Sequence, residues 1–195
     1  MQIFVEGGGD DQNTRRRCRV AFVKFFEKVV DKGKQPKVRA CGGRDEAFKA
    51  FRAAIPKEPE ALLLVDAEGA VPSAALSDPW PHLGWKRPDD AGPRNVALMV
   101  QEMESWLLAD KTSVATYYGN GFREKALPAR EDIESVPKAA VNAGLAAATK
   151  DTKKGPYDKA LHGFDLIERI DPKLVRAASP HAERLCRIVR GEPDA

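Results

Sequence analysis

Residues 62–66 of the chain read Leu62-Leu63-Leu64-Val65-Asp66, a wholly apolar run that ends abruptly in a carboxylate. A short run of this kind, without alternating polar residues, predicts a strand that is buried on both faces. Three more short runs predict strands at 2–5, 37–41 and 95–100. Strands buried on both faces are typical of a mainly parallel sheet with helices on both sides, so the sequence predicts the α/β class.

Apolar residues at helical spacing separate and follow these runs. After the Gly7-Gly8-Gly9 turn, apolar residues between Cys18 and Val29 mark one helical face. Further helices are predicted at 47–55, 103–117, 137–150, 157–169 and 180–189. Segment 69–93 is Pro-rich and irregular, and a loop of this length is usually functional or mobile. Its two tryptophans, Trp80 and Trp85, are more often packing anchors than platforms for bases.

The length of 195 residues and the hydrophobic content of 43% suit one domain over 1–195. We expect an α/β core over 1–118 and a helical extension over 119–195. No apolar run is long enough to cross a bilayer, and the beginning of the chain lacks the basic region of a signal peptide. These features predict a cytoplasmic protein that does not contact a membrane.

The three cysteines show no pairing and no spacing typical of zinc ligands, which predicts free thiols in a reducing compartment, with Cys18 and Cys186 on the apolar faces of helices. They are Cys18, Cys41 and Cys186.

Carboxylates follow two of the predicted strands. Glu6 comes after the first strand and Asp66 ends the third, and the carboxyl ends of parallel strands meet at one edge of a sheet. Glu68 lies two residues beyond Asp66, so both side chains point the same way if the strand stays extended. Oxygen ligands without nearby His or Cys suit Mg²⁺ or Mn²⁺. The alternative is that these acids only make the surface soluble.

Glu104 opens the helix that is predicted after the fourth strand, so it too could reach the carboxyl edge as a metal ligand. The alternative is a favourable acid in a first helical turn. Behind Glu6, the glycines Gly8 and Gly9 allow close approach of the backbone to a ligand, and the next helix begins with unpaired N–H groups. Phosphate is the expected ligand, although neither of the nucleotide-binding motifs GxxxxGK(S/T) and GxGxxG is present.

Basic residues form two clusters in a chain of net charge +3. The first contains Arg15, Arg16, Arg17 and Arg19, and the second contains Lys150, Lys153 and Lys154. If the clusters flank the acidic edge, they would hold the backbone of a nucleic acid, although such clusters are usually solvated faces. Lys154, Tyr157 and Lys159 could contact phosphate, and Tyr157 could stack on a base; the alternative is a solvated loop.

Two of these patterns together resemble the Toprim pattern of topoisomerases, primases and related nucleases. They are Glu6-Gly7 after the first strand and Asp66-Ala67-Glu68 after a later one. The resemblance implies a Toprim-like, Rossmann-like fold in which Glu6 is the general acid/base and the acidic pair holds Mg²⁺. The chain has Asp-x-Glu where the Toprim pattern usually has Asp-x-Asp, which places one carboxylate a methylene further out.

The chain is also similar, over nearly its whole length, to the DUF4276 family of domains of unknown function. The matching segments are 5–10, 40–44, 63–68, 99–106, 155–159 and 179–184. The element Glu104-Ser105-Trp106 resembles one in the RloB-like Toprim proteins, which are found near restriction and anti-phage genes. The resemblance implies an ATPase of the ABC or AAA type as a partner.

Three functions remain open on these observations. The first is an Mg²⁺-dependent nuclease or related phosphoryl-transfer enzyme in a bacterial anti-phage defence module. The second is a non-catalytic nucleic-acid-binding or regulatory subunit of an ATPase-containing defence complex. The third is a base-acting, glycosylase-like enzyme that uses paired carboxylates without a metal. Fold alone does not choose among them.

Overall fold

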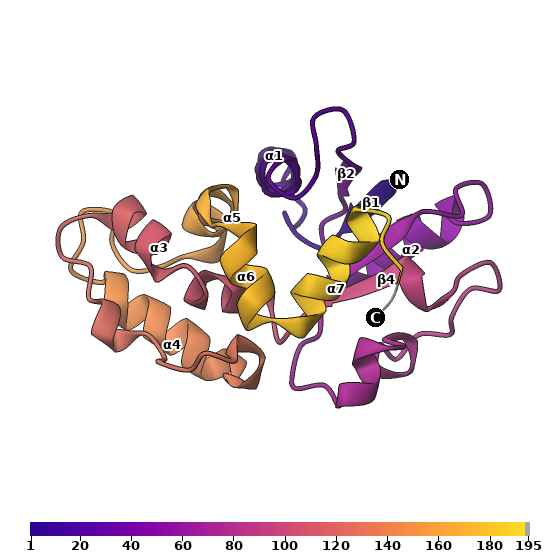
Figure 1. Ribbon diagram of the computed structural model, residues 1–195. Helices are drawn as coiled ribbons and strands as arrows, with labels where there is room; N and C mark the ends of the chain where they lie inside the picture. Colours follow the sequence, from indigo (N-terminus) through magenta and orange to yellow (C-terminus); the bar gives the residue numbers. More distant parts are fainter. Residues whose placement is uncertain (194–195) are drawn as a thin grey trace.

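A four-stranded, all-parallel sheet forms the centre of the protein, for which a computed structural model describes residues 1–193 (Figure 1). The strands are β1 (Gln2–Val5), β2 (Lys37–Ala40), β3 (Leu62–Asp66) and β4 (Val96–Met99). Their order across the sheet is β2-β1-β3-β4. Four apolar runs in the sequence therefore become the four strands, and the α/β prediction is confirmed.

The chain moves in opposite directions from the middle of the sheet. Helix α1 (Gln12–Glu27) leads from β1 to β2, and α2 (Arg44–Ala54) leads from β2 past β1 to β3. The next connection continues outward from β3 to β4. The carboxyl ends of β1 and β3 thus form the point at which the strand order reverses, where open α/β sheets bind their ligands.

Two apolar layers cover the two faces of the sheet. Side chains alternate along each strand, so Ile3 and Leu64 face one layer while Phe4 and Leu63 face the other. The first layer packs against α1, which also contacts α5 (Phe164–Arg169). The second layer packs against α2. Helices on both faces were predicted, and the structure has them.

Segment 69–93 completes the second layer. It contains short 3₁₀ turns at Ser73–Leu76 and Trp80–His82, and it buries Ala75, Trp80 and Leu83 against the sheet. The Trp80 indole N–H donates to the Gly92 carbonyl at 2.9 Å. The segment is therefore a packed cover of the sheet, and its tryptophans are anchors.

Part of the helical third of the chain extends away from the sheet, with α3 and α4 at the far end in Figure 1, whereas α7 returns to pack against β4. Its longer elements are α3 (Lys111–Tyr118), α4 (Lys138–Thr149), a π-helical turn η7 (Lys159–Gly163), α5, α6 (Pro172–Ala178) and α7 (Pro180–Val189). Short 3₁₀ turns lie at Pro93–Asn95, Met103–Leu108 (η4), Glu124–Ala126 and Ile133–Ser135.

Three predictions for this region were wrong in detail. The single helix expected over 103–117 is the 3₁₀ helix η4 followed by α3, because the Asp110 side chain accepts from the backbone N–H of Ser113 and begins a new helix. The helix expected over 157–169 starts with the π turn. Helix α6, which begins at Asp171-Pro172, was not predicted.

All three cysteines are free, as predicted, and all three are buried, which was predicted only for Cys18 and Cys186. None of the helices within residues 1–193 is both long and apolar enough to cross a membrane.

Candidate metal centre

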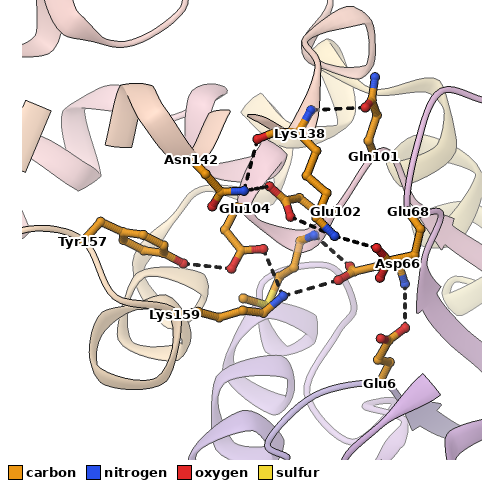
Figure 2. Close-up of polar contacts among 11 residues, drawn as sticks. Glu6, Asp66, Glu68, Gln101, Glu102, Glu104, Lys138, Asn142, Tyr157 and Lys159 are labelled. Atoms are coloured by element: carbon orange, nitrogen blue, oxygen red, sulfur yellow. Dashed lines mark hydrogen bonds and ion pairs between the residues drawn. The ribbon is translucent and has the colours of Figure 1, made fainter. Parts of the chain in front are cut away.

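Glu6 and Asp66 meet where the strand order reverses. The backbone N–H of Glu6 donates to the Leu64 carbonyl at 2.9 Å, which continues the β1–β3 pairing by one residue. The backbone N–H of Asp66 in turn donates to the Glu6 carboxylate (Oε2) at 3.0 Å (Figure 2). The Asp66 side chain is only 5% exposed. Local strand pairing alone therefore places the two acids side by side.

Glu68 reaches the same place by a different backbone path from the one predicted. The strand does not stay extended beyond Asp66, because Glu68 has a left-handed backbone with φ 65°. Its N–H donates to the Gln101 carbonyl at 2.9 Å, which ties this turn to the segment after β4. A left-handed backbone at a non-glycine residue persists where the surroundings hold it in place. One carboxylate oxygen from each of Glu6, Asp66 and Glu68 lies within 4.8 Å of the other two.

Lys159 joins Asp66 to Glu104. Its ammonium lies 3.3 Å from Asp66 Oδ2 and 3.1 Å from Glu104 Oε2, as Figure 2 shows. The Tyr157 hydroxyl donates to the other oxygen of Glu104 at 3.0 Å. The remaining Asp66 oxygen accepts the backbone N–H of Met103 at 2.8 Å. Glu104 is thus at the acidic edge, as the sequence suggested, but its contacts are with a lysine and a tyrosine.

A second lysine binds the outer side of the cluster. Lys138, from α4, contacts Glu68 Oε2 at 2.5 Å and Glu102 Oε2 at 3.5 Å. Asn142, one turn further along α4, donates to Glu102 Oε1 at 2.7 Å. Sequence reasoning missed Glu102, Lys138 and Asn142. The spacing of Glu102 and Glu104, two residues apart after a buried strand, was a signal for Glu102; nothing local identifies the residues of α4.

The charges of the site do not cancel. Two ammonium groups stand against five carboxylates: those of Glu6, Asp66, Glu68, Glu102 and Glu104. Burial, followed by the charge of Asp66, raises the pKa of Glu6 to about 7. Burial raises the pKa of Asp66 to about 6. For Glu102, burial and then the charge of Glu104 raise the pKa to about 7. Each shift means that the negative charge of the ionised carboxylate is not fully compensated by the surrounding protein groups.

The inner part of the cluster opens into a cavity of about 430 Å³. Glu6, Asp66 and Lys159 line it together with the 7–11 loop and Phe164. The cluster of three oxygens on the edge of this cavity therefore fits one hard divalent cation with room for a ligand beside it.

Gly8 lets the loop lie close to α1 at the rim of this cavity. Its φ is +91°, and a Cβ at this position would lie 2.5 Å from the Arg15 Cα. Glycine is therefore required for the loop to pass here. The first turn of α1 is less open to an anion than the sequence suggested, because the Asp11 carboxylate accepts the N–H of Thr14 at 2.6 Å.

The residues predicted to contact nucleic acid fall into different places. Gly8 and Gly9 line the cavity, and Lys159 reaches into it. The hydroxyl of Tyr157 donates a hydrogen bond to Glu104. Lys154 instead lies over the ring of Tyr117 at 4.6 Å, and within the described part of the chain it makes no hydrogen bond or ion pair with the acidic cluster. Arg15 and Arg16 lie on α1, beyond the cavity rim.

Comparison with known proteins gives one match. The sequence model of the family described as Domain of unknown function (DUF4276) matches residues 5–190. No curated protein and no solved structure matches the chain.

Proposed function

The chain belongs to the DUF4276 family, and we propose that it is a metal-dependent nuclease or related phosphoryl-transfer enzyme that acts on nucleic acid. One observation carries the proposal. Carboxylate oxygens of Glu6, Asp66 and Glu68 converge within 4.8 Å at the reversal point of a parallel sheet, on the edge of a cavity. An oxygen-only set of this kind suits Mg²⁺ or Mn²⁺.

In this proposal Asp66 and Glu68 hold the cation, with Glu6 beside them. When bound there, a divalent cation would supply stabilisation of phosphoryl charge and would lower the pKa of a water molecule. Asp66 is fixed for this role, because one of its oxygens accepts from Met103 N and the other faces the cavity beside Lys159. The surplus of carboxylates over ammonium groups favours a divalent cation at this position.

Glu6 is the residue that moves a proton. Burial raises the pKa of Glu6 to about 7 in the metal-free protein, and a cation held by Asp66 and Glu68 would lower it, so that the carboxylate would be ionised and able to accept a proton at neutral pH. One of its oxygens is anchored by the N–H of Asp66, so the orientation of the carboxylate is set by the backbone. The other oxygen is left to accept a proton from a nucleophile in the cavity.

Lys159 is the lysine of the site that lines the cavity. Its side chain is 48% exposed and lines the cavity, while its ammonium is held between Asp66 and Glu104. From this position the ammonium orients a phosphate oxygen. Tyr157, which binds the far oxygen of Glu104, fixes the partner of the lysine and so acts as a positioning residue.

The biological setting is part of the same proposal. The resemblance to Toprim and RloB-like proteins supports a cytoplasmic enzyme of an anti-phage defence module, in which an ABC- or AAA-type ATPase is the partner. The test of that setting is co-purification of the chain with an ATPase encoded next to it.

The decisive experiment for the activity is a cleavage screen. Single- and double-stranded DNA and RNA are incubated with the protein in Mg²⁺, Mn²⁺ or EDTA. The variant Asp66→Asn should lose cleavage, whereas Asp89→Asn, at an exposed position outside the site, should keep it. Cleavage that persists in EDTA would contradict the proposal and favour a base-acting enzyme that uses no metal.

One observation favours a second candidate. Lys138 and Lys159 already contact four of the five carboxylates, an arrangement that can hold the site together without a metal. A regulatory, nucleic-acid-binding subunit would have such a site. It would bind nucleic acid with or without Mg²⁺, and Glu6→Ala would leave that binding unchanged.

A further inference from the structure

The arginines between residues 15 and 19 of α1 point in different directions. Arg17 turns toward the helical third of the chain, where it donates to the carbonyls of Ala160 and Leu161 at 2.6 Å each and pairs with Asp165 at 3.0 Å. It is therefore a structural residue that holds α1 to the π turn and α5. Its neighbours Arg16 and Arg19 are exposed on a different side of the helix.

Arg15, Arg16 and Arg19 line a groove of about 590 Å³ between α1 and the strand β2. Arg39 of β2 also lines the groove, and its guanidinium lies over the Phe4 ring at 5.7 Å, on the face of the sheet that packs against α2. No acidic residue lines it. Within residues 1–193, none of these four arginines forms an ion pair with a carboxylate. A groove with this lining is a concentrated positive surface.

The positive surface continues to the other side of β2, which is the edge strand of the sheet. A second hollow of about 350 Å³ is lined by Arg15, Arg39 and Lys49, with Glu46 as its one acid. Arg15 and Arg39 line both hollows, so the two are neighbours. Cations from α1, β2 and α2 thus converge along one edge of the molecule.

The groove and the acidic cavity lie on opposite sides of the first turn of α1. Asp11 and Thr14 line the cavity, whereas Gln12 and Asn13 line the groove. The two are also joined through the glycine loop, because the backbone of Gly8 packs against Arg15. The groove and the acidic cavity are therefore neighbours, separated by the first turn of α1 and the glycine loop.

We propose that this groove binds the sugar–phosphate backbone of a nucleic acid and guides the strand toward the acidic cavity. The phosphodiester backbone is a regular row of single negative charges, and arginine guanidinium groups contact phosphate oxygens in pairs of hydrogen bonds. The groove has the arginines and lacks the acids that would oppose such a ligand. The inference rests on the proposed function for the substrate class, but binding in the groove requires no chemistry.

The test measures binding apart from cleavage. Fluorescence anisotropy of labelled single-stranded DNA and RNA is recorded in EDTA, over a series of salt concentrations, for the wild type and for Arg16→Gln/Arg19→Gln/Arg39→Gln. We expect the Kd of the triple variant to rise by at least ~30-fold. The slope of log Kd against log salt should fall by about 2, since about 0.7 counterions are released per phosphate of a single strand.

The matched control removes three exposed lysines outside both basic clusters, as Lys57→Gln/Lys86→Gln/Lys125→Gln, and should leave the Kd within ~3-fold. Arg16→Glu/Arg19→Glu, which keeps the contact of Arg39 with Phe4, gives the same loss of binding if the triple variant melts early. Equal losses in the groove and control variants, or no loss in the groove variants, would overturn the inference.

The experiments distinguish an error in the groove-binding inference from an error in the proposed nuclease function. If the groove variants bind poorly while the wild type binds but never cleaves, the groove stands and the nuclease proposal fails. If the wild type cleaves and the groove variants bind and cleave equally well, the nuclease proposal stands and the groove fails. The shift of the melting temperature by Mn²⁺ should be the same in the groove variants as in the wild type, because they leave the carboxylates intact.

Discussion

The backbone N–H of Asp66 donates to the carboxylate of Glu6 at 3.0 Å. The last residue of β3 therefore orients the acidic side chain that follows the neighbouring strand β1. The two residues are 60 positions apart in the sequence. Because the donor is backbone, substitution of the Asp66 side chain leaves this orientation in place. The charge of Asp66 and the position of Glu6 can therefore be tested separately.

Asp66→Asn should abolish stabilisation by metal. In the wild type, Mg²⁺ or Mn²⁺ at 100 times its Kd should add about 2.7 kcal/mol to the free energy of unfolding, a shift of roughly 5–10 °C for a chain of this size. Asp66→Asn removes a ligand and should show no shift, while its metal-free melting temperature stays equal or rises. Asp89→Asn is the control. A wild-type melting curve that neither ion moves would argue against the metal site.

The stability of the metal-free protein should fall as the pH rises. The pKa of Glu6 is raised to about 7 and that of Asp66 to about 6, so the folded state binds these protons more tightly than the unfolded state. This contribution is complete below the ordinary carboxyl pKa of about 4 and is lost as the pH rises through 6 to 7. Metal binding should tighten over the same interval, because protons and the cation compete for the same oxygens.

Glu6→Gln tests the pH dependence directly. One unit of pKa shift corresponds to about 1.4 kcal/mol, and solvent screens part of the Glu6 carboxylate, so at pH 8 without metal the variant should be more stable than the wild type by about 1–2 kcal/mol. At pH 5 the difference should be smaller. Urea unfolding at both pH values measures this, with Glu58→Gln as the exposed control. An equal difference at pH 5 and pH 8 would show that Glu6 does not titrate as stated.

Lys159→Met should destabilise the protein through the acids that it leaves behind. Asp66 and Glu104 are 5% and 1% exposed, and neither would keep an ammonium partner. Loss of one partner of a fully buried ion pair costs about 3–5 kcal/mol; the lysine is half-exposed, so we expect about 1–3 kcal/mol. Lys154→Met, which touches no carboxylate of the site and loses only its contact with the Tyr117 ring, should cost less than about 1 kcal/mol. The double variant Glu104→Gln/Lys159→Met should recover part of the loss if the pair interacts as described.

The strands and the first two acids could be predicted because their signals are local. An apolar run such as 62–65 identifies a buried strand by itself, and Glu6 and Asp66 follow from where two such runs end. The prediction for Glu68 had the right position and the wrong reason. It assumed an extended backbone, whereas the turn depends on a hydrogen bond to Gln101 that no local pattern specifies.

The outer half of the site could not be predicted, because it depends on how distant helices pack. Lys138 is 70 residues from Glu68, and nothing in the sequence of α4 shows that this lysine faces the sheet rather than solvent. Packing against distant elements also contributes to the break in the helix that was expected over 103–117. Glu102 and Glu104 are held by lysines from other elements, although the capping residue Asp110 was a readable signal for a new helix.

Gly8→Ala should disrupt the loop that carries Glu6, whereas Gly9→Ala provides a neighbouring control. A Cβ on Gly8 would lie 2.5 Å from the Arg15 Cα at a φ of +91°, while a Cβ on Gly9 meets no atom within 4 Å at a φ of +52°. We expect a loss of more than about 2 kcal/mol for Gly8→Ala and about 1 kcal/mol for Gly9→Ala. Chemical denaturation measures both. Equal losses would mean that the contact with Arg15 does not constrain the loop.

Glu6→Gln also separates proton transfer from metal binding. The amide oxygen of glutamine can still accept the N–H of Asp66, so the side chain should keep its place, and Asp66 and Glu68 should still hold Mn²⁺, although more weakly. An amide cannot take a proton from a nucleophile near neutral pH, so turnover should fall by at least ~100-fold. Single-turnover cleavage at saturating Mn²⁺ measures the chemical step apart from metal affinity. A variant that regains wild-type turnover when more Mn²⁺ is added would show that Glu6 is only a ligand, and the proton would then have to leave by way of another group at the cavity.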